Sequence, residues 1–197
     1  EWTERKGLND FVILAQENPD IRFIVVGVTP EQQKKLPTEL VGICRTSNVN
    51  ELVELYSIAD VFFNPTYEDN YPTTNLEALA CGTPVVTYDT GGSPEVIEDA
   101  LVNYGTIVGG IVTKETTQQV NLNKVIDEIR KIIGLVNTPI VNVGYSTRSD
   151  NVKEKSPIMT LGKEAYSLRE RCRSVALRYR KEQRFAEYIE LYKEVLS

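Results

Sequence analysis

The sequence predicts an α/β protein built on a parallel β-sheet with helices on both faces. Short apolar runs alternate along the chain with segments whose apolar residues recur at helical spacing, which is typical of strand–helix–strand units. The run from Ile21 to Val26 is continuously apolar and is closed by Gly27, as expected for a strand buried on both faces. Right-handed crossovers would then gather the loops that follow the strands at one edge of the sheet: Gly27, residues 45–50, residues 69–75 and Gly91-Gly92.

Each element of the first half has a local signal. A helix is expected after Gly7, and Thr29-Pro30-Glu31 starts another helix that stops before Pro37. Residues 40–43 predict a short strand, and Asn50 is the expected cap of the helix that follows it. Two of these helices carry apolar stripes, formed by Leu8, Phe11, Val12 and Ala15 in the first and by Leu52, Leu55, Tyr56 and Ala59 in the third.

The second half continues the alternation. Residues 61–63 predict a strand, and a polar loop then leads through Pro72 into a short helix. Residues 84–87 predict the next strand, and Pro94 opens another helix. The last strand is expected within residues 105–112, where Gly109-Gly110 interrupts it.

Beyond residue 112 the pattern is mainly helical. Residues 118–133 predict an amphipathic helix, residues 138–157 a polar loop or linker, and the remainder two final helices. We therefore expect a main domain over 1–135, a linker over 136–158 and C-terminal helices over 159–197. The inward-facing residues of the three helices are predicted to be Leu122, Val125, Ile126, Ile129 and Ile133; Leu168, Cys172, Val175, Ala176 and Tyr179; and Phe185, Tyr188, Ile189, Tyr192 and Leu196.

Composition excludes several classes of function. The 197 residues suffice for one α/β domain with a core, and the net charge of −6 argues against nucleic acid as a partner. No apolar run approaches the length of a membrane span. The three isolated cysteines fit reduced thiols in the cytoplasm, and the lack of histidine disfavours a zinc site and removes the commonest general base.

The chemistry is concentrated between Tyr67 and Glu95. Seven residues separate the carboxylates of Asp69 and Glu77, and the helix start between them leaves backbone N–H groups free for an anion. Gly91-Gly92 offers a second turn that a ligand could approach closely. Carboxylates beside two anion-binding turns suggest a ligand with phosphates in the middle and hydroxyls at both ends, as in a nucleotide sugar.

The same stretch resembles the nucleotide-sugar-binding half of the retaining glycosyltransferases of family 4, which have the two-domain GT-B architecture. In that family an acidic residue, seven residues and a glutamate precede an Ala-x-Ala-x-Gly-x-Pro-Val run. Here the pattern reads Asp69, then Glu77-Ala78-Leu79-Ala80-Cys81-Gly82-Thr83-Pro84-Val85, and later Gly91-Gly92-Ser93-Pro94-Glu95. The match is most specific over 59–98, extends over 1–58 and is weak after about residue 100. The family usually has glutamate at the first acidic position, which leaves open whether Asp69 or Glu68 fills it.

The resemblance implies a Rossmann-like domain, the C-terminal half of a GT-B fold, that binds a nucleoside diphosphate sugar as substrate and needs no cofactor or metal. Lys6 and Arg5 would hold the diphosphate, although the family's basic residue stands about five positions before the Lys-Gly pair. Glu77 would bind the ribose, and Asp69 or Glu68 the transferred sugar; Asp69, Glu77 and Lys6 are the candidate catalytic residues. Further donor-binding positions are the backbone around Tyr71, Thr73, Thr74, Asn75 and Leu76 at the phosphates, Gly27, Gly91 and Gly92 along the edge, and Arg45 near the base.

The resemblance further implies transfer of a sugar to a glycan or lipid-linked acceptor in surface polysaccharide biosynthesis. Because the chain opens inside a strand-to-helix connection, we expect a fragment that turns over little, with the acceptor held by an N-terminal domain missing here. A basic stripe in the C-terminal helices is interpreted as a solvated face paired with Glu170 and Glu182, or alternatively as a peripheral contact with the inner face of a membrane; it comprises Arg169, Arg173, Arg180 and Arg184.

Three other functions remain to be weighed. A non-catalytic nucleotide-binding regulatory module would share the sheet and the anion-binding turns. A glycosidase would use the two carboxylates as an acid and its partner, but would leave the glycine turns and the helix start without a purpose. A dinucleotide dehydrogenase is disfavoured because no Gly-x-Gly-x-x-Gly follows any predicted strand.

Overall fold

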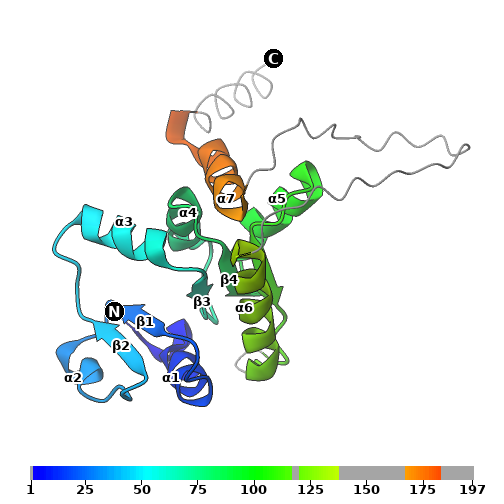
Figure 1. Cartoon of the computed structure of the whole chain (residues 1–197). Helices are drawn as coiled ribbons and strands as arrows, with labels where there is room; N and C mark the ends of the chain where they lie inside the picture. Colours follow the sequence, from blue (N-terminus) through cyan, green and yellow to red (C-terminus); the bar gives the residue numbers. More distant parts are fainter. Residues whose placement is uncertain (1, 117–119, 138–166, 183–197) are drawn as a thin grey trace, which may run out of the picture.

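The computed structural model describes residues 2–116, 120–137 and 167–182, and it confirms the α/β class with parallel strands and helices on both sides of them (Figure 1). The strands are β1 (Phe23–Val26), β2 (Leu40–Ile43), β3 (Phe62–Asn64), β4 (Val85–Tyr88) and β5 (Gly109–Val112). The α-helices are α1 (Leu8–Glu17), α2 (Pro30–Gln33), α3 (Val49–Ile58), α4 (Thr73–Ala80), α5 (Glu95–Tyr104), α6 (Leu122–Asn137) and α7 (Leu168–Ala176), and the 3-10 turns are η1 (Glu4–Lys6) and η2 (Leu177–Tyr179).

The strands form two parallel sheets within the described residues, where the sequence led us to expect one. β1 pairs with β2, Phe23 opposite Leu40, and β4 lies between β3 and β5, with Val85 opposite Phe62 and Gly109. The edges of β1 and β3 line a cleft and do not pair, so the described strands form one two-stranded sheet and one three-stranded sheet. Sequence periodicity identifies strands but carries no information about which edges meet.

Because β1 and β3 do not pair, the expectation that β1 is buried on both faces is wrong. Phe23 and Val25 are buried, but Ile24 is 37% exposed, so β1 is buried on one face only. Helix α1 covers the buried face, because the Phe11 ring meets that of Phe23 at 6.2 Å between centroids. All four residues of β4 are buried, which is the pattern of a strand covered on both faces.

The helix ends and stripes differ from the prediction in detail. Helix α3 is capped by Asn48, whose Oδ1 accepts the Glu51 N–H at 3.0 Å, so the predicted cap Asn50 lies inside the helix. In α6 the fully buried residue near the end is Ile132, whereas Ile133 is half-buried at the edge of the stripe. With 3.6 residues per turn, positions 125, 129 and 132 share one face.

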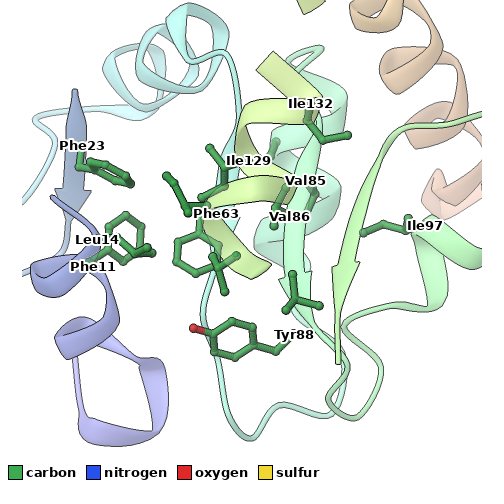
Figure 2. Packing of buried hydrophobic residues seen from close by; sticks show 14 of the residues in the cluster. Phe11, Leu14, Phe23, Phe63, Val85, Val86, Tyr88, Ile97, Ile129 and Ile132 are labelled. Carbon is green, nitrogen blue, oxygen red and sulfur yellow. The ribbon is translucent and has the colours of Figure 1, made fainter. Parts of the chain in front are cut away.

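Aromatic rings connect the two sheets through the core (Figure 2). The Phe11 ring lies 5.2 Å from that of Phe63 on β3, and Phe63 in turn lies 5.7 Å from Tyr88 on β4. Val85 and Val86 on β4 are completely buried behind them. The core is therefore continuous from α1 to the three-stranded sheet although the backbones of β1 and β3 do not pair.

The first C-terminal helix, α7, packs on the domain, and its arginines correct our interpretation of the basic stripe. Arg169 donates to the Ser57 and Ala59 carbonyls at the end of α3, at 3.1 and 3.0 Å, and Arg173 donates to the Cys81 carbonyl at the end of α4, at 3.1 Å. Helix C-termini favour cations because their last carbonyls lack partners. These two arginines therefore serve as helix caps, Arg169 half-buried and Arg173 still exposed to solvent.

The hydrogen bonds of Glu170 go to Ser167 and not, as expected, to the described arginines of the stripe. Glu170 forms a capping box with Ser167, whose Oγ and N–H lie 2.9 and 2.7 Å from the carboxylate. These hydrogen bonds to Ser167 lower the pKa of Glu170. The predicted second C-terminal helix, Arg184 and most of the predicted linker lie outside the described residues. No helix among the described residues has the length and hydropathy to cross a membrane.

Candidate functional site

A cleft of 1180 Å³ runs along the facing edges of β1 and β3. Its lining extends from Asp20 before β1 to Gly27 after it, and from Ala59 before β3 to Thr66 after it. Apolar side chains form much of the lining, Ile24, Phe62 and Ile129 among them. At the end where the strands terminate, the lining includes Lys6, Asp69, Thr73 and Thr74, with Glu77 one turn further along α4. A second group of charged residues also lines the cleft: Asp20, Arg22, Asp60 and Arg130.

The polar end is formed in part by the first turn of α4. The N-cap of this helix is Pro72, which has no side-chain oxygen to accept from the helical N–H groups. Thr73 and Thr74 are the first two helical residues and line the cleft, so their N–H groups lack a partner from their own helix. This arrangement suits an anion.

The remaining residues of the predicted phosphate cradle have other roles. The Asn75 N–H donates to the Pro72 carbonyl at 3.1 Å, and its buried side chain joins Asn64 (2.9 Å) to the Ser93 carbonyl (3.1 Å). Leu76 is half-buried against the core. Tyr71 lines the cleft, but its N–H donates to Asp69 Oδ1 at 3.2 Å. Asn75 and Leu76 therefore shape α4 and do not face the cleft.

The structure separates the two candidate acidic residues of the loop before α4. Asp69 is half-buried and lines the cleft. The Glu68 side chain is 66% exposed, lies outside the lining and accepts from Arg5 Nη1 at 3.3 Å. Arg5 is thereby drawn toward Glu68, and Lys6 is the basic residue that lines the cleft.

Lys6 is held beside this loop by close backbone packing. Gly7 has φ of 70°, and a Cβ at this position would overlap the Pro65 carbonyl oxygen. In addition, the Tyr67 N–H donates to the Arg5 carbonyl at 2.7 Å. The turn that carries Lys6 is therefore in direct backbone contact with the loop that carries Asp69.

Glu77 lines the cleft from the second half of α4 and is exposed there. Its Oε2 accepts from the hydroxyl of Tyr56 on α3 at 3.4 Å. Burial, and then the neighbouring Glu77 carboxylate, raise the pKa of Tyr56, so this hydroxyl stays a donor. Sequence reasoning placed Tyr56 in an apolar stripe and missed this contact, for which the sequence carries no local signal.

The glycine pair contacts the acidic loop rather than the cleft. The Gly92 N–H donates to the Asn70 carbonyl at 2.8 Å, so this donor is already paired, and neither Gly91 nor Gly92 belongs to the lining. Gly27 does line the cleft at the end of β1. Arg45 is exposed after β2 and lies outside the lining. Within the described residues no three acidic or cysteine side chains are grouped as a metal site.

Comparison with known proteins gives one family over most of the chain. The family model described as "Glycosyl transferases group 1" matches residues 3–132. An alpha-galactosylglucosyldiacylglycerol synthase of Streptococcus pneumoniae is 32% identical over 134 residues, which are 61% of this chain and 34% of that protein. A D-inositol 3-phosphate glycosyltransferase of Actinosynnema mirum is 30% identical over 118 residues, 52% of this chain and 28% of that protein. The chain thus spans about a third of the length of these relatives.

Two solved structures show the same fold. The sucrose-phosphate synthase of Thermosynechococcus elongatus superposes with a TM-score of 0.59 at 18% identity, covering 98% of this chain and 43% of that one. HepE of Anabaena, solved in complex with UDP-glucose, superposes with a TM-score of 0.55 at 16% identity, covering 96% and 46%. At these identities the likeness establishes the fold alone.

Proposed function

The chain belongs to the glycosyl transferases group 1 family, and we propose on this premise that it is the nucleotide-sugar-binding half of a retaining glycosyltransferase. The donor is a nucleoside diphosphate sugar, and the acceptor is a hydroxyl of a glycan or of a lipid-linked sugar. The observation that carries this proposal is that Lys6, Asp69, Glu77 and the first turn of α4 all line the same cleft.

Each of these groups matches one part of such a donor. The N–H groups of Thr73 and Thr74 and the Lys6 ammonium suit the diphosphate, and the Glu77 carboxylate suits the ribose hydroxyls. Asp69 is then the acidic residue for the hydroxyls of the transferred sugar. A carboxylate that accepts from a hydroxyl gives a charge-assisted bond, which is stronger than a neutral one.

The chemistry asked of these residues is mainly electrostatic. The bond from the anomeric carbon to the β-phosphate oxygen breaks, and a bond to the acceptor oxygen forms on the same face. The acceptor proton passes to the leaving phosphate, so no side-chain base is needed. Negative charge grows on the diphosphate as it leaves, and a cation and N–H groups already aimed at it lower the barrier.

The first test is a calorimetric titration of the chain with UDP, GDP and ADP and their glucose conjugates. We expect one nucleoside diphosphate to bind saturably and Glu77→Ala to weaken it roughly 30-fold, since a hydrogen bond to a charged group is worth about 2 kcal/mol. Glu98→Ala is the matched control, because Glu98 is exposed on α5 and lies outside the cleft. Equal affinity of the Glu77 and Glu98 variants would overturn the assignment of the ribose site.

A second pair of variants separates the neighbouring carboxylates. Asp69→Asn should reduce the extra affinity of the nucleotide sugar over the free nucleoside diphosphate by about tenfold, because one hydroxyl then meets a neutral amide. Glu68→Gln should leave this difference unchanged, since Glu68 is engaged with Arg5 outside the cleft. The reverse result would assign the sugar contact to Glu68.

A further inference from the structure

One buried carboxylate, that of Asp10, lies outside the lining of the cleft. Asp10 on α1 is 8% exposed, and its Oδ2 accepts from the hydroxyls of Tyr67 at 2.8 Å and Tyr88 at 2.6 Å. The two tyrosine rings meet edge to face, 5.1 Å apart. Burial, and then the hydrogen bond to Asp10, raise the pKa of both tyrosines, so that both remain neutral donors.

These three residues lie next to the turn that carries Lys6, the loop that carries Asp69, and the glycine turn that packs on this loop. Asp10 follows Lys6 by four positions on the helix that Gly7 opens. Tyr67 precedes Asp69 by two positions, and Tyr88 is the last residue of β4, three positions before Gly91. A single carboxylate oxygen therefore connects the basic turn, the acidic loop and the glycine turn.

The backbone of Tyr67 strengthens the same connection. Its N–H donates to the Arg5 carbonyl at 2.7 Å, and its carbonyl accepts from Thr90 Oγ1 at 3.2 Å and from Lys114 Nζ at 3.3 Å. Thr90 directly precedes the glycine turn, and Lys114 follows β5. The main chain of Tyr67 is thus hydrogen-bonded to the basic turn and to the residue before the glycine turn. Asp10 connects the same segments through side chains.

A buried carboxylate at this position is not expected to add much to the free energy of unfolding. Removing a carboxylate from water is costly, and two neutral hydroxyls repay this cost only in part. Apolar side chains of similar size often replace buried polar groups without loss of stability. A hydrogen-bonded carboxylate instead fixes direction, because it holds each hydroxyl at a defined distance and angle.

We propose that Asp10 is a positioning residue of the donor site, which holds the Lys6 turn, the Asp69 loop and the Gly91-Gly92 turn in register through Tyr67 and Tyr88. This inference rests on the proposed function for its ligand, but the ordering of the loops can be measured without one. Loss of one hydroxyl contact should loosen the acidic loop and displace Asp69 from the sugar. A shift of about 1 Å is enough to cost about a hundredfold in a positioned site.

The experiment compares Tyr67→Phe, Asp10→Asn and Asp10→Ala with the matched control Tyr179→Phe. The control also removes a tyrosine hydroxyl bonded to an aspartate, here Asp99 at 3.1 Å, between η2 and α5. Calorimetry with UDP-, GDP- and ADP-glucose is run well below the melting temperature of every variant. Hydrogen exchange of residues 67–71 and 90–92 is measured on the free proteins.

We expect Tyr67→Phe to weaken nucleotide-sugar binding at least fivefold and to speed exchange in both loops, whereas Tyr179→Phe changes affinity less than twofold. Asp10→Asn, which keeps one acceptor oxygen, should retain more affinity than Asp10→Ala. Unchanged exchange in Tyr67→Phe and Asp10→Asn would overturn the positioning role, whatever binds. Failure of the parent protein to bind any of the nucleotides would instead count against the proposed function, and the exchange result would still decide the role of Asp10.

Discussion

Gly91→Ala should lower the free energy of unfolding by about 3–4 kcal/mol and abolish measurable donor binding. Gly91 has φ of 49°, where a side chain costs about 1–2 kcal/mol. Its Cβ would also overlap the Asp69 carbonyl oxygen, and forcing packed groups apart costs about 1–3 kcal/mol more. Because that oxygen belongs to the acidic loop, relief of the overlap must displace the residue that we assign to the sugar.

Gly105→Ala is a control that separates the backbone strain from the steric overlap. Gly105 ends α5 with φ of 58°, and a Cβ there would have no neighbour within 4 Å among the described residues. The control therefore carries the backbone strain without the overlap, and we expect a loss of about 1 kcal/mol and unchanged nucleotide affinity. Urea unfolding and the donor titration measure both effects. If the two variants proved alike, the glycine turn would not constrain the acidic loop.

The sequence was sufficient to locate the polar end of the cleft. Lys6 and Asp69 each precede a predicted helix, and Glu77 lies inside the second of these helices. Topology places the starts of both helices at the same edge of the parallel strands. It could not distinguish Asp69 from Glu68, because neighbouring residues in a loop point in different directions that depend on local hydrogen bonds. In the structure Asp69 accepts a hydrogen bond from the Tyr71 N–H, and Glu68 accepts one from Arg5.

Contacts between distant segments account for what could not be predicted. Asp10 meets residues 57 and 78 positions away, and nothing in its neighbourhood marks it as buried. The separation of β1 from β3 is of the same kind, since each strand is correctly found but the pairing of its edge depends on the whole fold. Helical spacing likewise predicted a basic face on α7 but not its contacts: Arg169 bonds to the end of α3, and Arg173, which stays exposed, bonds to the end of α4.

Arg169→Met should lower the free energy of unfolding by about 3 kcal/mol. The Arg169 side chain is 27% exposed, lies 3.6 Å from Asp60 and donates to two carbonyls at the end of α3. Hydrogen bonds from a charged group contribute about 1.5–3 kcal/mol each, and methionine keeps the apolar stem while leaving both carbonyls without this donor. Urea unfolding gives the loss, and limited proteolysis reports whether α7 detaches from the domain.

Arg171→Met is the matched control, because it removes the same charge from the same helix without touching the end of α3. Binding of both variants to vesicles with a third of anionic lipid distinguishes helix capping from the membrane contact that the sequence also allowed. Capping requires that Arg169→Met be destabilising and that both variants bind vesicles equally. If Arg169→Met instead kept its stability and lost vesicle binding, the arginine would be released from α3 at a membrane, and the contacts with Ser57 and Ala59 would describe only the free protein.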